Sequence, residues 1–210
     1  MLDPAMKKAP PKRPRNAAAT RQAILASARE AFARAGYDGA GVREIAAGAG
    51  VTAMLVNRYF GSKEKLFSEA VAETLATTAV LLPQILNASA TGEAIAATLL
   101  RITNTGATPL AGFQIMLRSA SSERAAEIGR EQVEKFHHRL ITAALPGDNA
   151  AQRAAVILSL IAGFQVMRQM IRLNSLAKAD PETLMGILGP LFQFLIDGDR
   201  RGKSDLTDAR

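Results

Sequence analysis

The chain has 210 residues, of which 48% are hydrophobic, 5% aromatic and 21% charged, and it contains no cysteine and no tryptophan. The absence of cysteine excludes disulfides, Cys-ligated zinc and a catalytic thiol, and it fits a cytoplasmic protein. A chain of this length can bury a substantial core as one large domain or two small ones, and the sequence favours two. Because alternating β-branched runs are missing, we expect an all-α fold.

Positive charge is concentrated at the N-terminal end. Residues 1–65 carry 12 basic and 5 acidic side chains, a net charge of +7, which is also the net charge of the whole chain. Residues 66–210 are therefore neutral. A basic pattern that served solubility alone would be spread along the chain, so this segregation predicts that the N-terminal end binds a polyanion such as nucleic acid.

Both termini are expected to be disordered. Residues 1–19 form a basic arm rich in Pro and Ala that cannot bury a core, and residues 201–210 form a second tail. The arm is either merely solvated or reaches phosphates or an adjacent minor groove. No apolar segment follows the basic N-terminus, and no uninterrupted apolar stretch has membrane-spanning length. We therefore expect a soluble cytoplasmic protein with no membrane partner.

Residues 20–65 contain three short helical patterns separated by glycines. The first ends at Gly36, expected to be a left-handed stop, the second ends at Gly50, and the third begins at Thr52, a good N-cap. The positions expected to face inward are Ile24, Leu25, Ala28, Ala31, Phe32, Val42, Ile45, Ala46, Ala49, Val56 and Phe60. Two helices joined by a tight turn and braced by a preceding helix form a helix-turn-helix, so we interpret this segment as a DNA-binding domain.

The third helix of such a unit enters the major groove through its outward face. The outward positions here are Ala53, Met54, Asn57 and Arg58. A simpler interpretation is that Asn57 and Arg58 are only the solvent-exposed face of the helix. Because this face is the only route into the groove, we favour base contact, more strongly for Arg58 than for Asn57.

Residues 51–67, VTAMLVNRYFGSKEKLF, closely resemble the tetracycline-repressor (TetR) family of bacterial transcriptional regulators, and the likeness extends back through FARAGYDGAGVREIAAGAG. The family pattern is Gly-Val-Ser, a short helix ending in an aromatic pair, then Ser-Lys-Glu. The strong part covers about a quarter of the chain, and the rest is similar only in architecture. The resemblance implies a ligand-responsive repressor that binds a palindromic double-stranded DNA operator as a homodimer.

The resemblance also implies roles for the residues that match the motif. Arg43 would reach a guanine edge or a phosphate, and Thr52 would place the start of its helix beside a phosphate. Tyr59 and Lys63 would hold the DNA backbone, with Ser62 capping the helix from which Lys63 projects. The complete expected DNA-binding set is Arg43, Thr52, Ala53, Met54, Asn57, Arg58, Tyr59 and Lys63.

Three residues depart from the family pattern. Gly41 stands where a Thr or Ser usually caps the second helix, so a hydroxyl contact to phosphate is absent, although Gly is itself an acceptable cap. Met54 replaces a small residue that allows close approach to DNA. Asn57 replaces the common Tyr and could read adenine with two hydrogen bonds.

Residues 66–200 are expected to form a helical regulatory and dimerisation domain. A helix from Ser62 to about Pro83 would tie the two domains together, and further helices are expected at residues 91–103, 110–120, 122–145, 149–173 and 181–196. The resemblance implies that this domain binds a small molecule and dimerises through its last two long helices. The dimerisation candidates are Ala155, Leu158, Ala162, Gln165 and Gln169, with Gly163, Gly186 and Gly189 permitting close approach. From spacing alone, these residues could equally close the core of a monomer.

An apolar effector cavity is expected on the middle helices, lined by Phe113, Met116, Leu117, Phe136, Leu140, Phe164 and Met167. Each of these could instead be ordinary core. Possible polar anchors are Asn104, Gln114, Arg118, His137 and Arg168. Because His137 and His138 are adjacent on a helix, they point apart, and we expect no metal site and no cofactor.

Other functions remain open at this point. One alternative is a ligand-independent architectural or activating DNA binder, and another is a helical small-molecule carrier or enzyme with a basic appendage. No paired carboxylates, Ser-His-Asp order or phosphate-cradling loop supports catalysis, so we do not expect an enzyme.

Overall fold

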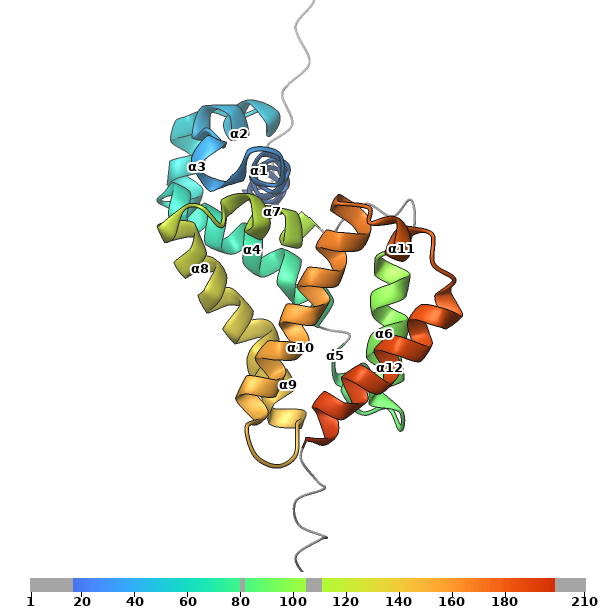
Figure 1. Cartoon of the computed structure of the whole chain (residues 1–210). Helices are drawn as coiled ribbons and strands as arrows, with labels where there is room; N and C mark the ends of the chain where they lie inside the picture. Colours follow the sequence, from blue (N-terminus) through green and yellow to red (C-terminus); the bar gives the residue numbers. More distant parts are fainter. Residues whose placement is uncertain (1–16, 80–81, 105–110, 199–210) are drawn as a thin grey trace, which may run out of the picture.

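The computed structural model describes residues 17–79, 82–104 and 111–198, and every regular element among them is helical. The N-terminal helices are α1 (Ala17–Gly39), α2 (Val42–Gly48), α3 (Ala53–Phe60) and α4 (Lys63–Ala79). The remaining elements are α5 (Leu82–Leu86), α6 (Thr91–Ile102), α7 (Ala111–Ser119), α8 (Glu123–Val133), η1 (Glu134–His138), α9 (Arg139–Ala144), α10 (Ala150–Gln165), η2 (Val166–Met170), α11 (Asn174–Ala177) and α12 (Pro181–Asp197). Figure 1 shows α1, α2 and α3 grouped at one end, with α4 leading into the larger bundle. The all-α expectation is confirmed.

Helix α1 differs from expectation at both ends. It begins at Ala17, because three consecutive alanines favour the helix, so the expected boundary of the basic arm at residue 19 is corrected. The rest of that arm and the expected C-terminal tail lie outside the described residues. Gly36 has the expected positive φ of 70°, but the helix resumes after this kink and continues to Gly39. Gly36 is required there because a Cβ would overlap the carbonyl oxygen of Arg118.

Two hydrophobic cores organise the molecule, and the first crosses the expected domain boundary near residue 65. Its fully buried members include Ile24 and Phe32 of α1 and Phe67 of α4. Ile115 of α7 and Ile128 of α8 pack into the same cluster, so two helices expected in the regulatory domain support the DNA-binding end. The second core joins α6, α9, α10 and α12 through buried Leu99, Ile141, Ile157 and Phe192.

Two π-helical turns interrupt the long helices of the bundle. α8, η1 and α9 follow one another from Glu123 to Ala144, and α10 and η2 run together from Ala150 to Met170. The sequence patterns predicted these spans as single helices and missed the π turns. They also missed α11 and the short helix α5, which contains Pro83 within its first turn.

The segment Ala150–Met170 is the one described helical segment that is long and apolar enough on average to cross a membrane, although polar residues interrupt it. Its 21 residues are long and apolar enough, by length and composition, to cross a membrane, with a mean hydropathy of 1.4 over its most apolar window and 17% of that window buried. One such helix is weak evidence for a span, and Arg153 and Arg168 lie within it. Its buried positions, including Ala154 and Ile157, belong to the second core.

The turn η2 caps the C-terminal end of α6. The Arg168 guanidinium donates to the carbonyl oxygen of Leu100 at 3.4 Å and to the hydroxyl of Thr103 at 3.1 Å, and Gln169 donates to the carbonyl oxygen of Ile102 at 3.1 Å. Cations and donors at this end satisfy carbonyls that lack helical partners. Burial lowers the pKa of Arg168.

Candidate nucleic-acid interface and effector cavity

The turn between α2 and α3 has the geometry of a helix-turn-helix. α2 ends at Gly48 with Ala49 as its C-cap, and the amide of Val51 donates to the carbonyl oxygen of Ala46 at 2.9 Å. Gly50 has a φ of 64°, a backbone conformation that glycine adopts without steric cost. The side chain of Thr52 then accepts from the amide of Leu55 at 3.4 Å, which confirms the expected N-cap of α3.

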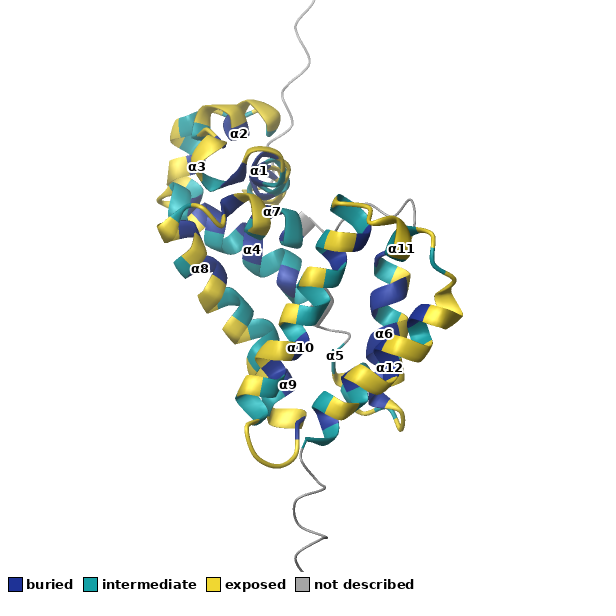
Figure 2. Ribbon diagram, in the orientation of Figure 1, coloured by how far each residue is buried: buried dark blue, intermediate teal, exposed yellow. Residues whose placement is uncertain are grey.

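The outer face of α3 is exposed (Figure 2). Met54 is 82% exposed, and Asn57 and Arg58 are exposed beside it, whereas Val56 and Phe60 on the opposite face are buried. Ala53 and Tyr59 are half-buried, and Thr52 is exposed at the start of the helix. The helix therefore offers an exposed face of mixed character, with Asn57 and Arg58 beside the apolar Met54, that nothing else in the described chain covers.

Arg43 lies on α2 and is exposed, next to the exposed N-cap Gly41, which makes no side-chain capping bond. Lys63 begins α4, where its ammonium lies 4.7 Å from the centre of the Tyr37 ring and donates to the carbonyl oxygen of Asp38 at 3.5 Å. Tyr37 thus holds Lys63 at the edge of the α3 face. Ser62 caps α4 by accepting from the amide of Lys65 at 3.2 Å, as expected.

Some arginines of the DNA-binding end are held in ion pairs between helices, and others are not. Arg29 pairs with Glu73 at 3.1 Å, joining α1 to α4. Arg21 pairs with Glu69, and Arg34 pairs with Glu44. Arg43 and Arg58 make no ion pair with another residue in the described ranges, so their charge is available to an external anion.

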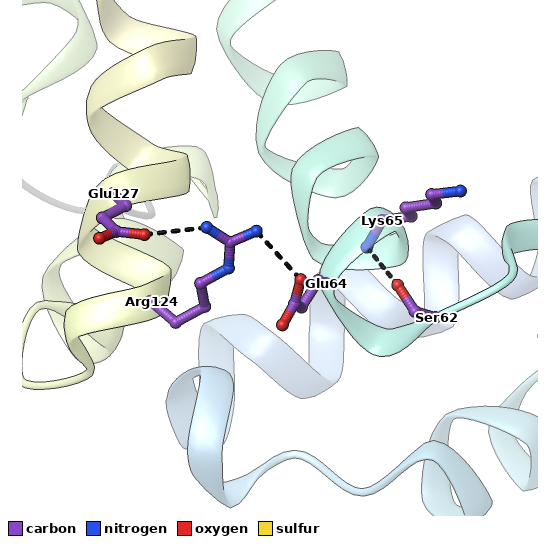
Figure 3. A network of polar contacts seen from close by, with 5 residues as sticks. All are labelled: Ser62, Glu64, Lys65, Arg124 and Glu127. Carbon is purple, nitrogen blue, oxygen red and sulfur yellow. Dashed lines mark hydrogen bonds and ion pairs between the residues drawn. The ribbon is translucent and has the colours of Figure 1, made fainter.

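A polar network fixes the start of α4 against α8 (Figure 3). The Arg124 guanidinium donates to Glu127 at 2.8 Å and to Glu64 at 3.1 Å. These two hydrogen bonds raise the pKa of Arg124. Because Glu64 follows Lys63 directly, the network ties the first turn of α4 to the bundle. It was not predicted from the sequence, since Arg124 and Glu64 are 60 residues apart.

A cavity of about 540 Å³ lies where the two hydrophobic cores meet. Its wall takes Leu75 from α4 and Met116 from α7 on the side of the first core, and Leu99 and Ile157 from α6 and α10 on the side of the second. Helices α1, α5, α8 and α9 and the turn η1 also contribute. The volume suits a drug-sized organic molecule.

Of the seven residues expected to line a cavity, the structure brings two together there, Phe113 and Met116. Leu117, Leu140 and Met167 are instead between 39% and 46% exposed. The other two, Phe136 and Phe164, pack against the first and the second core respectively. The expected lining is therefore corrected.

Polar groups on the cavity wall are few. Among the five expected anchors, only His137 lines the cavity, and burial lowers the pKa of its imidazole, which favours the neutral form. Gln165, expected at a dimer interface, lines the cavity and is only 4% exposed. Leu158 and Ala162 also line it, so part of the face expected to dimerise turns inward.

Helix α7 connects the cavity to the DNA-binding end. Phe113 near its start and Met116 in its second half line the cavity. At its end, the hydroxyl of Ser119 accepts from the amide of Tyr37 at 2.9 Å, and Gly36 lies against the carbonyl of Arg118. A change in cavity shape can therefore reach α1 through one helix.

In the described ranges, no group of three or more His, Asp or Glu side chains is placed to hold a metal ion. The adjacent histidines are separated as expected, because His138 contacts the carbonyl oxygen of Ala151 at 2.9 Å while His137 lines the cavity.

The fold is similar to those of solved bacterial regulators. A TetR-family regulator from Streptomyces coelicolor A3 is 24% identical, with 90% of this chain and 100% of that chain covered and a TM-score of 0.58. A transcriptional regulator from Rhodococcus sp. Rha1 is 22% identical, with 85% and 96% covered and a TM-score of 0.61. The regulator FadR from Bacillus subtilis, solved in complex with stearoyl-CoA, is 17% identical, with 84% and 98% covered and a TM-score of 0.62.

Two family descriptions match the sequence itself. Residues 24–70 match "Bacterial regulatory proteins, tetR family", and residues 90–196, just over half of the chain, match "Tetracyclin repressor-like, C-terminal domain". No curated protein is similar enough in sequence to count as a match. The first match covers the exposed α3 face and most of its supporting core, and the second covers most of the cavity wall. The chain therefore belongs to the TetR family of bacterial DNA-binding transcriptional regulators.

Proposed function

We propose that this regulator is a cytoplasmic repressor that binds a palindromic operator as a homodimer and leaves it when a small apolar molecule occupies the cavity. The exposed α3 face carries this proposal. It presents Asn57 and Arg58, and the preceding helix α2 exposes Arg43. No intramolecular ion pair between described residues neutralises either arginine. A helix of eight residues is about 12 Å long and reads few base pairs, so two copies on two half-sites supply specificity.

The contacts on each half-site divide into two kinds. Arg58, Asn57 and Arg43 read base edges, since bidentate Arg to guanine and Asn to adenine are the geometries that distinguish bases. Thr52, Ala53, Tyr59 and Lys63 surround the base-reading face and hold the phosphate backbone. Met54, at 82% exposure, is the apolar group that meets a thymine methyl.

The dimer forms through the outer faces of α10 and α12. Exposed apolar side chains on these helices and on η2 are Val156, Met167, Ile187, Leu191 and Phe194. A Cβ built on Gly163 or Gly186 meets nothing within 4 Å, so a second helix can approach both positions closely. Gly189, in contrast, packs inside the protomer against Glu93 of α6.

Release from DNA requires that the effector bind the DNA-incompetent conformation more tightly than the competent one. A shift from almost fully bound to almost fully released needs a preference of about 10⁴-fold if a single two-state switch carries it. The cavity wall includes Arg29 of α1, Thr74 of α4 and Phe113 of α7, so an effector in the cavity contacts three helices that build the first core. That FadR from Bacillus subtilis was solved with stearoyl-CoA supports small-molecule binding by this fold.

Selection of bound sequences from random duplex DNA, at one fixed salt concentration, tests the proposal. We expect a two-fold symmetric consensus and a footprint that matches one dimer. A bound pool without any consensus, with protein spreading along the DNA, would instead establish the architectural alternative. Sedimentation of the free protein at micromolar concentration should give a dimer, and a monomer both free and on DNA would overturn the dimeric model of recognition.

A further inference from the structure

Among the described residues, the amide of Gln165 is a buried polar group on the cavity wall without a partner. The side chain borders the cavity and is only 4% exposed. Its amide makes no hydrogen bond with any other residue of the described ranges. An amide that borders a cavity and has no partner in the protein is available to hydrogen-bond a ligand or ordered water.

The charges around the cavity disfavour an ionic ligand. Within the described part of the chain, Arg29 is the one formally charged side chain on the wall, and its guanidinium already donates to the Glu73 carboxylate at 3.1 Å. An anionic ligand would therefore meet Glu73 as well as Arg29, and no carboxylate of the described ranges lines the wall to hold a cationic one. The imidazole of His137 is shielded from water, which lowers its pKa and favours its uncharged form.

One π-helical turn contributes to the cavity wall, and the other begins directly after a wall residue. His137 lies within η1, and Gln165 immediately precedes η2. A π turn changes the face on which the following side chains lie, and such turns are frequent at functional sites. The hydroxyls of Thr74 and Ser159, also on the wall, are already bonded to carbonyl oxygens of their own helices. The hydroxyl of Thr98 also lines the wall without a hydrogen bond to a described residue, but Thr98 is only half-buried, whereas Gln165 is buried.

We propose that the effector is an electrically neutral, mostly apolar molecule with one carbonyl, amide or hydroxyl group, and that Gln165 hydrogen-bonds that group inside the cavity. This inference rests on the proposed function, in which the cavity is the effector site. The apolar wall excludes water and binds the body of the molecule, while Gln165 selects its polar group.

Three probes with one shared apolar body test the assignment: butylbenzene, 4-butylbenzamide and 4-butylbenzoate. Each displaces the neutral fluorophore N-phenyl-1-naphthylamine from the full-length protein, whose lack of tryptophan simplifies the signal. We expect the wild type to bind the amide at least tenfold more tightly than the benzoate. Gln165→Met keeps the side-chain length without the amide. The variant should bind 4-butylbenzamide about tenfold more weakly than wild type, while its affinity for butylbenzene changes less than twofold.

Gln152→Met is the matched control, because Gln152 is a glutamine on the same helix that lies outside the cavity wall. If the benzoate binds wild type best, or if Gln165→Met leaves the amide affinity unchanged, the inference is wrong. The affinities of the three probes for wild type test whether the cavity prefers a neutral ligand, even if Gln165→Met does not fold. In that case Gln165→Leu tests the role of Gln165.

Binding of the fluorophore itself distinguishes a failure of this inference from a failure of the proposed function. Ala162→Phe fills the cavity and should abolish binding of the fluorophore. If the fluorophore binds wild type and Ala162→Phe equally, or binds neither, the cavity is not the effector site and both proposals fail. If wild type binds the fluorophore, Ala162→Phe does not, and the three probes bind wild type with equal affinity, the cavity remains the effector site but the role of Gln165 is rejected.

Discussion

The α3 face and the cavity wall both present polar side chains to a ligand, but they do so in opposite surroundings. On α3, Asn57 and Arg58 stand on an exposed surface, where water and salt compete with every contact. In the cavity, Gln165 and His137 stand among apolar side chains, where a single hydrogen bond discriminates strongly. The exposed face therefore gains specificity from several contacts repeated in two protomers, whereas the cavity can gain it from one.

The largest expected effect is the loss of effector-induced operator release when the cavity is filled and the α3 face is left unchanged. Ala162→Phe places a ring in the cavity, so an effector that releases the wild type should no longer release the variant, while the variant still binds operator DNA. Operator release against a panel of neutral apolar compounds measures this. Met116→Trp, on the opposite wall, should give the same result. Unchanged potency in both folded variants would place the effector site elsewhere.

The connection between the two regions can be broken at Gly36. With φ 70° and ψ −178°, this residue occupies backbone space that is essentially restricted to glycine, and a Cβ would also overlap the Arg118 carbonyl. Gly36→Ala should therefore lower the free energy of unfolding by about 3 kcal/mol. Urea denaturation gives the value. Gly41→Ala, where φ is −90°, is the control for glycine replacement at an ordinary backbone conformation.

Alanine variants of the DNA-binding end can distinguish side chains that contact bases from side chains that contact the phosphate backbone. Arg58→Ala and Arg43→Ala should each weaken operator binding by about 1–3 kcal/mol and reduce the preference over random duplex. Lys63→Ala should weaken binding to all DNA sequences similarly, and it should lower the slope of log affinity against log salt concentration by about one unit. Competition titrations with operator and random DNA measure both quantities. Arg130→Ala, an exposed arginine on α8, is the matched control, and equal losses on both duplexes would make Arg58 a phosphate contact.

The smallest expected effect is the pH dependence contributed by the interior. Burial lowers the pKa of His137 in the folded state, so the unfolded chain takes up a proton first as the pH falls. The contribution of His137 to stability is therefore intact above about pH 6.5 and is lost progressively below it. His137→Gln should flatten this acid-side loss in thermal unfolding. A variant with the same decline below pH 6.5 as wild type would assign the decline to other groups.

Sequence patterns predicted the exposed region well because its signals are local. Gly50, Thr52 and Ser62 act within a few residues of their own positions, and the structure places each at the turn or cap that its chemistry favours. The same patterns predicted most helix spans correctly. They could not predict that Ile115 and Ile128 pack with α1–α4, since that packing depends on contacts between distant segments.

The cavity was less predictable because helix phase decides which side chains face inward. A π turn inserts about one residue, which rotates the subsequent side chains by roughly 100° relative to a continuous α-helix. Leu140 comes after η1 and Met167 lies in η2, and both are exposed. Gln165, expected on an outer face, is buried where α10 passes into η2. No local signal in the sequence marks either π turn.

Helix α7 has a thermodynamic consequence that arises from its two ends. It is nine residues long, about 13 Å, and too short to absorb a displacement by bending. Any preference of an effector for one position of Phe113 is therefore a preference for one position of Ser119 and of α1. Because free energies of binding are reciprocal, operator DNA that holds α1 must weaken the effector by the same factor by which the effector weakens the operator. Under the proposed mechanism, the protein therefore binds its effector more weakly on the operator than when free, and the effector concentration needed for induction depends on how much operator is present.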